Sequence, residues 1–216
     1  MKKSYVYLAA LLVSITACKK EEVKVESTTT DTTTVVKDEA PAEAAKPMDS
    51  VAMQKAWEEY ATPGEMHKML ADETGNWTAD TKMWMDPSKA PETSTMKAEI
   101  KMILGGRYQE AKYTGTFMGQ PFEGKSTVGY NNASGEFSQT WVDNMGTGIM
   151  SMNGKYDPAT KTASYTGDCI DPMTRKPKKI RQTYQIVDAN TRKMESFDTA
   201  PDGKEYKSME ITMHRK

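Results

Sequence analysis

The 216-residue sequence is poor in the residues from which most catalytic and metal sites are built, with two cysteines and two histidines. Two cysteines cannot form a disulfide scaffold, and His67 and His214 do not have the spacing of zinc ligands. The 29 Lys and Arg balance 30 Asp and Glu, so the chain has no basic excess to bind nucleic acid by counterion release. A mean hydropathy of −0.72 excludes a multi-span membrane protein.

Long apolar runs are also missing, except for one short run near the N-terminus. Lys2 and Lys3 precede an apolar stretch at residues 5–15, which is too short to cross a bilayer core of about 30 Å. The tetrapeptide Ile15-Thr16-Ala17-Cys18 then resembles the lipobox of bacterial lipoproteins. This resemblance implies that residues 1–17 are a signal peptide and that Cys18 carries the lipid. Several acyl chains would anchor the protein stably in a membrane.

Residues 18–50 are expected to be the lipidated cysteine and a disordered tether. The stretch after Cys18 has no aromatic residue and no glycine, and it is rich in Thr, Glu, Lys, Ala and Pro. Residues 19–22 lack the aspartate that resembles an inner-membrane retention signal, which favours the outer membrane of the cell envelope. A lysine followed by two acids also resembles a surface-export signal. The sequence leaves open whether the protein faces the periplasm or the cell surface.

Residues 51–216 are expected to form the folded domain, which opens with one or two short helices. Residues 51–60 place their apolar side chains near one face at the helical period. Thr62 and Glu65 have the spacing of a capping box, with Pro63 suited to the first turn of a second helix. The side chains of Met66, Met69 and Leu70 would then point inward.

The rest of the domain changes to the period of strands. Alternating segments are separated by short turns rich in Gly, Asn, Asp and Pro, with no helix between them. The expected strands are residues 77–86, 96–104, 107–117, 122–130, 136–143, 149–156, 162–168, 180–187, 192–198 and 205–215. The pattern predicts an all-β antiparallel meander of about ten strands that closes into a barrel, because closure removes the exposed edges. A two-sheet sandwich is the alternative.

Gly75-Asn76-Trp77 is the local motif with most information about the fold. A G-x-W that follows a short helix and begins the first strand resembles the lipocalin and calycin signature. In that signature, the tryptophan closes one end of the barrel against a basic residue of the last strand. The resemblance implies that Trp77 closes this barrel and that Arg215 stacks on it.

Several further segments resemble a bacterial family, domain-of-unknown-function family fifteen-seventy-nine. They are residues 62–65 (TPGE) with His67, 102–108 (MILGGRY), 117–119 (FMG), 121–124 (PFEG), 129–131 (GYN) and 141–148 (WVDNMGTG). This resemblance covers most of residues 51–216 and implies a lipocalin-like fold. The family has no established activity, so the resemblance implies no catalytic residue.

The sequence contains few residues that could form a catalytic site or a metal site. It has no nucleophile elbow of the G-x-S-x-G type, and Cys169 lies among acids that raise the pKa of a thiol. Asp168 and Asp171 fit a solvated turn better than a cation site. We therefore expect a protein that is not an enzyme and that has no metal or cofactor.

Two alternatives involve a bound metal or cofactor, namely Cu(I) and haem. Methionine pairs on single strand faces, such as Met150 and Met152, could bind Cu(I), but adaptable methionines more often fill a core or line a pocket. Haem could bind through His214. If Arg215 stacks on Trp77, however, His214 points away from the barrel interior.

The predicted inner face contains a possible ligand site. It combines methionines and aromatic residues, as a pocket for a small apolar molecule requires. The possible lining residues are Met83, Met85, Met102, Tyr113, Phe122, Trp141, Met150 and Met152, with Ile100, Val128, Ile211 and Met213 on the same faces. We expect non-catalytic binding of a small apolar or amphipathic ligand. The alternative is a filled barrel that acts as a protein-interaction or structural module of the envelope, with a partner that the sequence does not name.

Overall fold

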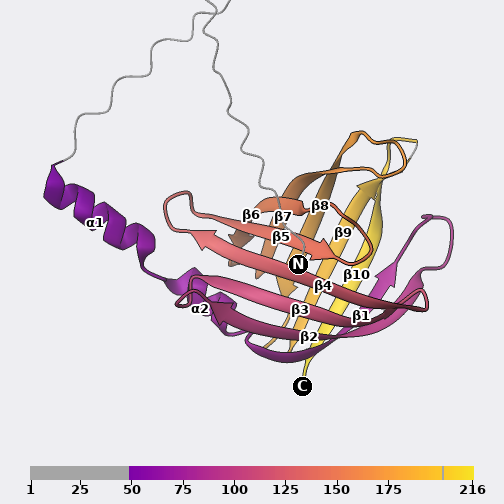
Figure 1. Ribbon diagram of the computed structural model, residues 1–216, viewed down its shortest axis with the longest axis horizontal. Coiled ribbons are helices and arrows are strands. Elements are labelled where there is room, and N and C mark those ends of the chain that lie inside the picture. The colour runs from indigo at the N-terminus through magenta and orange to yellow at the C-terminus, as the bar shows by residue number, and fades with distance from the viewer. Residues whose placement is uncertain (1–48, 201) are drawn as a thin grey trace, which may run out of the picture. The chain divides into compact units, whose positions relative to one another are not determined.

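The computed structural model describes residues 49–200 and 202–216, and it places two helices before ten strands (Figure 1). The helices are α1 (Ser50–Ala61) and α2 (Glu65–Ala71). The strands are β1 (Gly75–Met83), β2 (Glu92–Ile103), β3 (Tyr108–Phe117), β4 (Gln120–Asn131), β5 (Glu136–Asp143), β6 (Met150–Asp157), β7 (Thr162–Ile170), β8 (Pro177–Ile186), β9 (Thr191–Thr199) and β10 (Glu205–Arg215).

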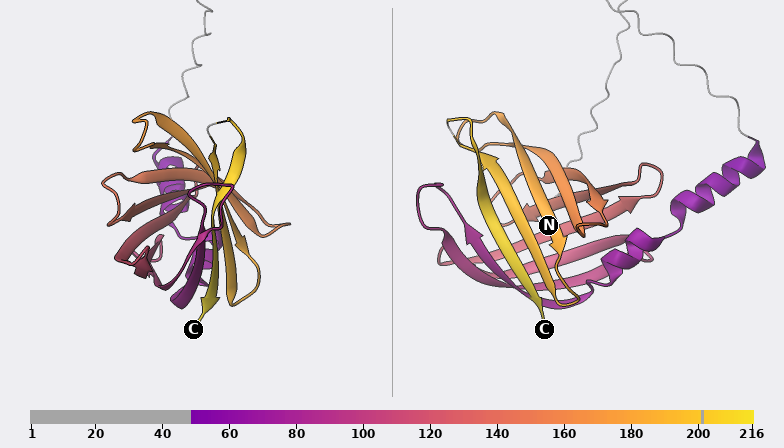
Figure 2. Two further views of the ribbon diagram at one scale, coloured as in Figure 1. Left: turned by 90° about the vertical axis from the view of Figure 1, so that its right-hand side faces the viewer. Right: turned by 180° about the vertical axis from the view of Figure 1, so that it is seen from behind.

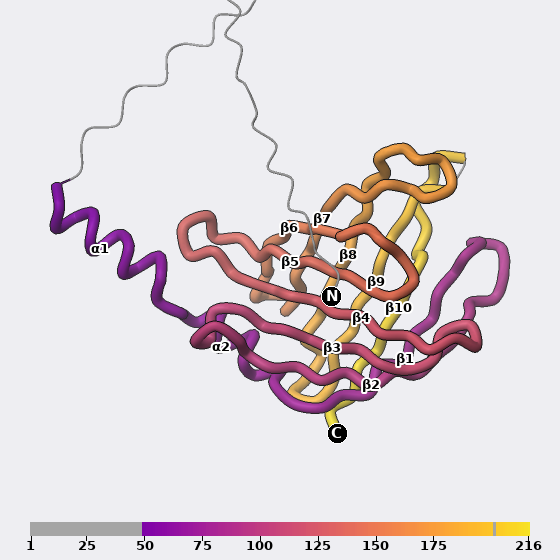
Figure 3. Tube along the Cα trace, in the orientation of Figure 1, coloured from indigo at the N-terminus to yellow at the C-terminus, as the bar shows by residue number. Residues whose placement is uncertain are grey.

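The ten strands form a closed antiparallel barrel. Each strand pairs with its neighbour in sequence, and β1 closes the ring by pairing with β10, with Trp77 opposite Arg215 and Met83 opposite Met209. Figure 3 shows β1 beside β10, and Figure 2 shows the same ring of strands from two further directions. The predicted meander and barrel are confirmed, and the two-sheet sandwich is wrong. Closure leaves none of the ten described strands with an unpaired edge.

The antiparallel order gives the barrel two different ends. We call the end that carries α2 the base, and it also holds the turns that follow β2, β4, β6 and β8. We call the other end the mouth, and it holds the loops that follow β1, β3, β5, β7 and β9. Helix α2 lies against β2, β3 and β4.

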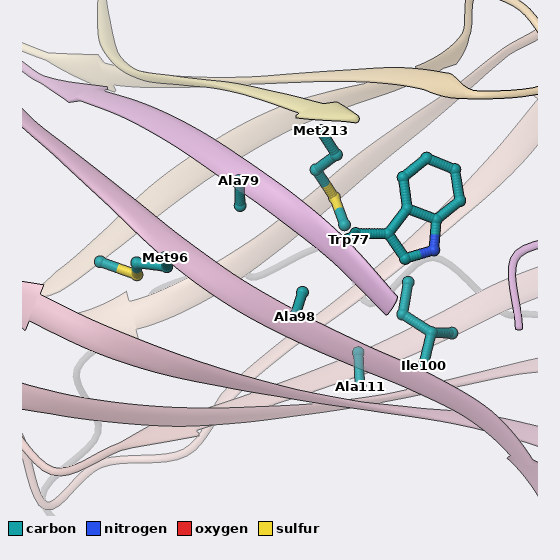
Figure 4. Close-up of a cluster of buried hydrophobic side chains, with 7 residues drawn as sticks. All are labelled: Trp77, Ala79, Met96, Ala98, Ile100, Ala111 and Met213. Atoms are coloured by element: carbon teal, nitrogen blue, oxygen red, sulfur yellow. The ribbon is translucent and has the colours of Figure 1, made fainter. Parts of the chain in front are cut away.

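The core consists of two clusters of buried side chains. The first cluster is Trp77, Ala79, Met96, Ala98, Ile100, Ala111 and Met213, which come from β1, β2, β3 and β10 (Figure 4). The second cluster is Leu70, Phe137, Met152, Ala163 and Tyr165. Leu70 belongs to α2, so this helix contributes directly to the second cluster. All but one of these core residues occupy strand positions, as the alternating pattern requires.

Helix α2 begins differently from the sequence prediction. The hydroxyl of Thr62 donates to the carbonyl of Glu58 at 2.6 Å, at the end of α1. The N-cap of α2 is Gly64, whose backbone N–H donates to Nδ1 of His67 at 3.0 Å. The predicted capping box between Thr62 and Glu65 is therefore wrong, because α1 already uses the threonine and the buried histidine takes the acceptor role.

Protonation of His67 is expected to destabilise the fold. Burial lowers the pKa of His67 below its ordinary value of 6.5, and the nearby Arg107 lowers it further, while a backbone hydrogen bond at Tyr130 opposes both effects. As pH falls through 6.5, the unfolded chain binds this proton before the folded chain does, so the free energy of unfolding decreases. Urea unfolding at pH 7.5 and pH 5 should show this loss. His67→Gln keeps a hydrogen-bond acceptor without titrating and should lose less stability; equal losses would contradict the assignment.

Residues 47–216 form one compact unit of the chain. This unit contains every strand of the closed barrel and both core clusters, so we expect it to fold by itself. Neither described helix is long and apolar enough to cross a membrane. The predicted signal peptide, Cys18 and nearly all of the predicted tether lie outside the described residues.

Candidate functional site

The barrel encloses a cavity of about 500 Å³. Side chains from α2 and from all ten strands line it, and it extends from Leu70 and Glu73 at the base to Met85, Met118 and Met145 in the mouth loops. Its volume lies within the range of pockets that bind small molecules and cofactors.

Methionine dominates the cavity wall. Ten of the 17 methionines line it, namely Met69, Met83, Met85, Met96, Met118, Met145, Met150, Met194, Met209 and Met213. Met85, Met118 and Met145 are exposed at the mouth, so the apolar wall continues to the surface. Flexible thioether side chains can adapt their shape to different apolar ligands.

Aromatic rings form one side of the cavity around Trp141. The Trp141 ring stacks on Phe122 with centroids 6.3 Å apart and meets the edge of Tyr113 at 5.4 Å. Its Nε1–H donates to the carboxylate of Asp143 at 2.6 Å. Gly124 provides the space for this ring, because a Cβ atom there would lie 2.5 Å from it. These contacts fix the orientation of the ring in the wall.

A buried hydrogen-bond network surrounds Glu73 at the base of the barrel. The Glu73 carboxylate accepts from Nε of Arg192 at 2.8 Å, from Nε2 of Gln109 at 3.0 Å and from the hydroxyl of Tyr184 at 3.0 Å. Glu73 and Arg192 are both nearly inaccessible to solvent. Their opposite charges compensate one another, and the additional donors satisfy the remaining acceptor sites of the carboxylate.

Trp77 lies buried at the base beside this network. It is 1% exposed, and its Nε1–H donates to the carbonyl of Glu73 at 2.8 Å. The guanidinium carbon of Arg215 lies 4.3 Å from the ring centroid, and that of Arg192 lies 5.3 Å from it. The structure thus brings Trp77 and Arg215 together. Gly75, at φ +135°, leaves room for Arg215, because a Cβ atom there would lie 3.1 Å from its Nη1.

Three tyrosines present neutral hydroxyl groups within this interior. Burial raises the pKa of Tyr113, Tyr165 and Tyr184, and the negative charge of Glu73 raises each of them further. All three line the cavity, and their raised pKa values keep them protonated at neutral pH. The hydroxyl of Tyr113 contacts the sulfur of Met213 at 3.7 Å.

Six of the eight predicted lining residues line the cavity, namely Met83, Met85, Tyr113, Phe122, Trp141 and Met150. Met102 and Met152 lie elsewhere, and for them the prediction needs correction. Met152 is part of the second core cluster with Leu70, and Met102 packs against the same cluster. Strand alternation directs both side chains inward, but neighbouring side chains cover them there. Nε2 of Gln139, which lines the cavity, lies 3.3 Å from the sulfur of Met152.

Cys169, His67 and His214, for which the sequence predicts no catalytic role, lie outside the cavity wall. Burial raises the pKa of the Cys169 thiol, and the acids Asp198, Asp171 and Asp168 add to this effect, whereas Lys178 opposes it. His214 is exposed on β10, and His67 caps α2. Within residues 49–200 and 202–216, no three His, Cys, Asp or Glu side chains converge as metal ligands would.

The polar residues of the interior were not predicted from the sequence. Glu73 precedes the first strand, where no periodic pattern indicates its direction. A signal was present for Gln109, Gln182 and Arg192, because these polar residues occupy inward positions of alternating strands, and all three are buried.

Comparisons with known proteins identify the fold and the family. A crystal structure of Rv2717c from M. tuberculosis matches with a TM-score of 0.54 and 11% identity, over 72% of this chain and 99% of that chain. A redesigned beta barrel matches with a TM-score of 0.37 and 14% identity, over 71% and 99% of the two chains. No curated protein matches. The model of the family "Protein of unknown function (DUF1579)" matches residues 62–215, and the chain therefore belongs to the DUF1579 family.

Proposed function

We propose that this protein binds a small apolar or amphipathic molecule inside its barrel and does not act as an enzyme. The observation that carries the proposal is the cavity of about 500 Å³ with its wall of methionine and aromatic side chains. Such a wall favours apolar ligands of varied shape. The continuous apolar surface from the interior to the exposed Met85, Met118 and Met145 supplies an entry path.

The proposal places this barrel on a lipid anchor in the cell envelope. Its support is the lipobox-like sequence that ends at Cys18 and the polar stretch that follows it. A lipid-anchored binding protein would work close to a membrane, which is a reservoir of apolar molecules. In this proposal the cysteine carries the anchor and residues 49–216 carry the binding site.

A second candidate function is a protein-interaction module of the envelope. Apolar side chains that are strongly exposed on the mouth side favour it, namely Ile149, Ile170 and Met173. This function would use the outer surface and would not require the cavity. A variant that fills the cavity therefore separates the two candidates.

The test is a fluorescence titration of residues 47–216 with N-phenyl-1-naphthylamine, an uncharged dye that brightens on leaving water. We expect saturable binding of one dye per chain. Ser126 lines the cavity between Ala111 and Trp141 in the strand register, so Ser126→Phe places a ring in the ligand space. This variant should weaken dye binding by at least about 10-fold, equivalent to about 1.4 kcal/mol.

The matched control is Thr127→Phe, because residue 127 does not line the cavity and its neighbour in the chain does. It should bind the dye as the unmodified domain does. Unchanged binding by Ser126→Phe would exclude the cavity as the site. A lack of saturable binding by the unmodified domain would contradict the proposed function.

A further inference from the structure

The charges on the cavity wall exclude one class of amphipathic ligand. The acidic residues of the wall are Glu73 and Asp143, and no Lys, Arg or His occurs among the described residues that line the cavity. The buried Arg192 behind the wall is already paired with Glu73. A carboxylate or phosphate in the cavity would lose its hydration without meeting an unpaired cation, which is costly.

The second carboxylate of the wall is also fully engaged. Asp143 accepts hydrogen bonds from Nε1 of Trp141 at 2.6 Å and from the backbone N–H groups of Met145 at 2.9 Å and Gly146 at 3.2 Å. These contacts hold it in the mouth as a structural acceptor. It adds negative charge near the entrance, which further disfavours an anion.

Two buried hydroxyl groups on the inner face have no hydrogen-bond partner among the described residues. They are Oγ1 of Thr81 and Oγ of Ser94. The two residues face each other across β1 and β2, and Thr81 is 4% exposed and lines the cavity. Side chains directly opposite each other on neighbouring strands have Cβ atoms about 4.5–5.5 Å apart, so the two hydroxyls lie close together. Ser94 lies behind the wall and both oxygens are fully buried, so a ligand oxygen reaches them only after a χ1 rotation turns them toward the cavity. Buried polar groups normally have a partner, and these two point to one that a ligand would supply.

We propose that the cavity selects uncharged amphipathic molecules whose hydroxyl or carbonyl group binds Thr81 and Ser94, and that it rejects the corresponding anions. The inference rests on the proposed function and specifies the ligand class for the same cavity. Hydroxyl groups can both donate and accept, so they suit an alcohol, ester or amide equally. Tyr165 adds a neutral hydroxyl to the same wall, whereas the hydroxyls of Tyr184 and Tyr113 already donate to Glu73 and to the sulfur of Met213.

The first test compares ligands that differ in charge. 1-Decanol and decanoate, at pH 8, are titrated against N-phenyl-1-naphthylamine bound to residues 47–216, and decanol should displace the dye at a concentration at least about 10-fold lower. The dye itself should bind at least about 10-fold more tightly than 1-anilinonaphthalene-8-sulfonate, which has the same rings with a sulfonate added. Equal affinities in both pairs would overturn the selectivity and leave the binding function intact.

The second test removes the hydroxyl groups singly. Thr81→Val and Ser94→Ala should each weaken decanol binding by about 5- to 10-fold, as the loss of one hydrogen bond implies. Dye binding should stay within about twofold, because the dye needs no such contact. Thr95→Val is the matched control, since the Thr95 hydroxyl donates outside the barrel to Asp80 at 2.6 Å. Unchanged decanol binding by both variants would overturn the assigned contacts, whereas loss of saturable dye binding by the unmodified domain would overturn the function itself.

Discussion

Replacing Trp77 with alanine is expected to lower the free energy of unfolding by about 3–5 kcal/mol, the usual cost of truncating a buried aromatic residue. Trp77 is one of the most deeply buried large side chains of the described barrel, and it packs with Ala98, Ile100 and Met213 in the first core cluster (Figure 4). The carbonyl of Glu73 would lose its Nε1–H donor, and the guanidinium groups of Arg192 and Arg215 would lose their contact with the ring. The base of the barrel would then contain a void that small neighbours such as Ala98 cannot fill.

Equilibrium unfolding of residues 47–216 in guanidinium chloride measures the change in the free energy of unfolding. The matched control is Trp57→Ala on α1, where the side chain is 64% exposed. That substitution should change the free energy of unfolding by less than about 0.5 kcal/mol. A loss below about 1 kcal/mol for Trp77→Ala would refute the role of Trp77 as the residue that closes the barrel.

The second large effect concerns the buried ion pair. Glu73→Gln should destabilise the fold by about 3–5 kcal/mol, because it leaves the guanidinium of Arg192 buried without a counter-charge. Arg192 is only 3% exposed, so water cannot replace the lost carboxylate. The double variant Glu73→Leu/Arg192→Met should be more stable than Glu73→Gln, since it removes both charges.

Urea unfolding of the single and double variants tests this account. The matched control is Glu136→Gln, which breaks an exposed pair with Lys155 and should cost less than about 1 kcal/mol. If Glu73→Gln were as mild as Glu136→Gln, the buried pair would not have the structural role assigned to it.

Much of the barrel could be predicted from the alternating pattern. The bounds of β5 match the predicted residues 136–143, because Phe137 and Trp141 alternate with polar residues between two clear turns. β2 begins at Glu92, earlier than predicted, because residues 92–95 carry only polar side chains and give no apolar alternation. Ser94 and its hydroxyl were missed for this reason.

The candidate site was less predictable than the fold. Alternation indicates which side chains point into a barrel, but not which of them their neighbours cover, so Met102 and Met152 were assigned to the wall in error. The position of Glu73 depends on contacts with β3, β8 and β9, which are distant in sequence. Such tertiary contacts leave no local periodic signal.

The most direct test of the central claim is a crystal structure of residues 47–216 grown with 1-decanol. The account predicts continuous ligand density inside the barrel, with the ligand oxygen within hydrogen-bond distance of Thr81 and Ser94. It also predicts that Trp77 and Arg215 stay stacked at the closed base. A barrel interior filled by its own methionine side chains, with no ligand density, would contradict the account and favour the interaction module.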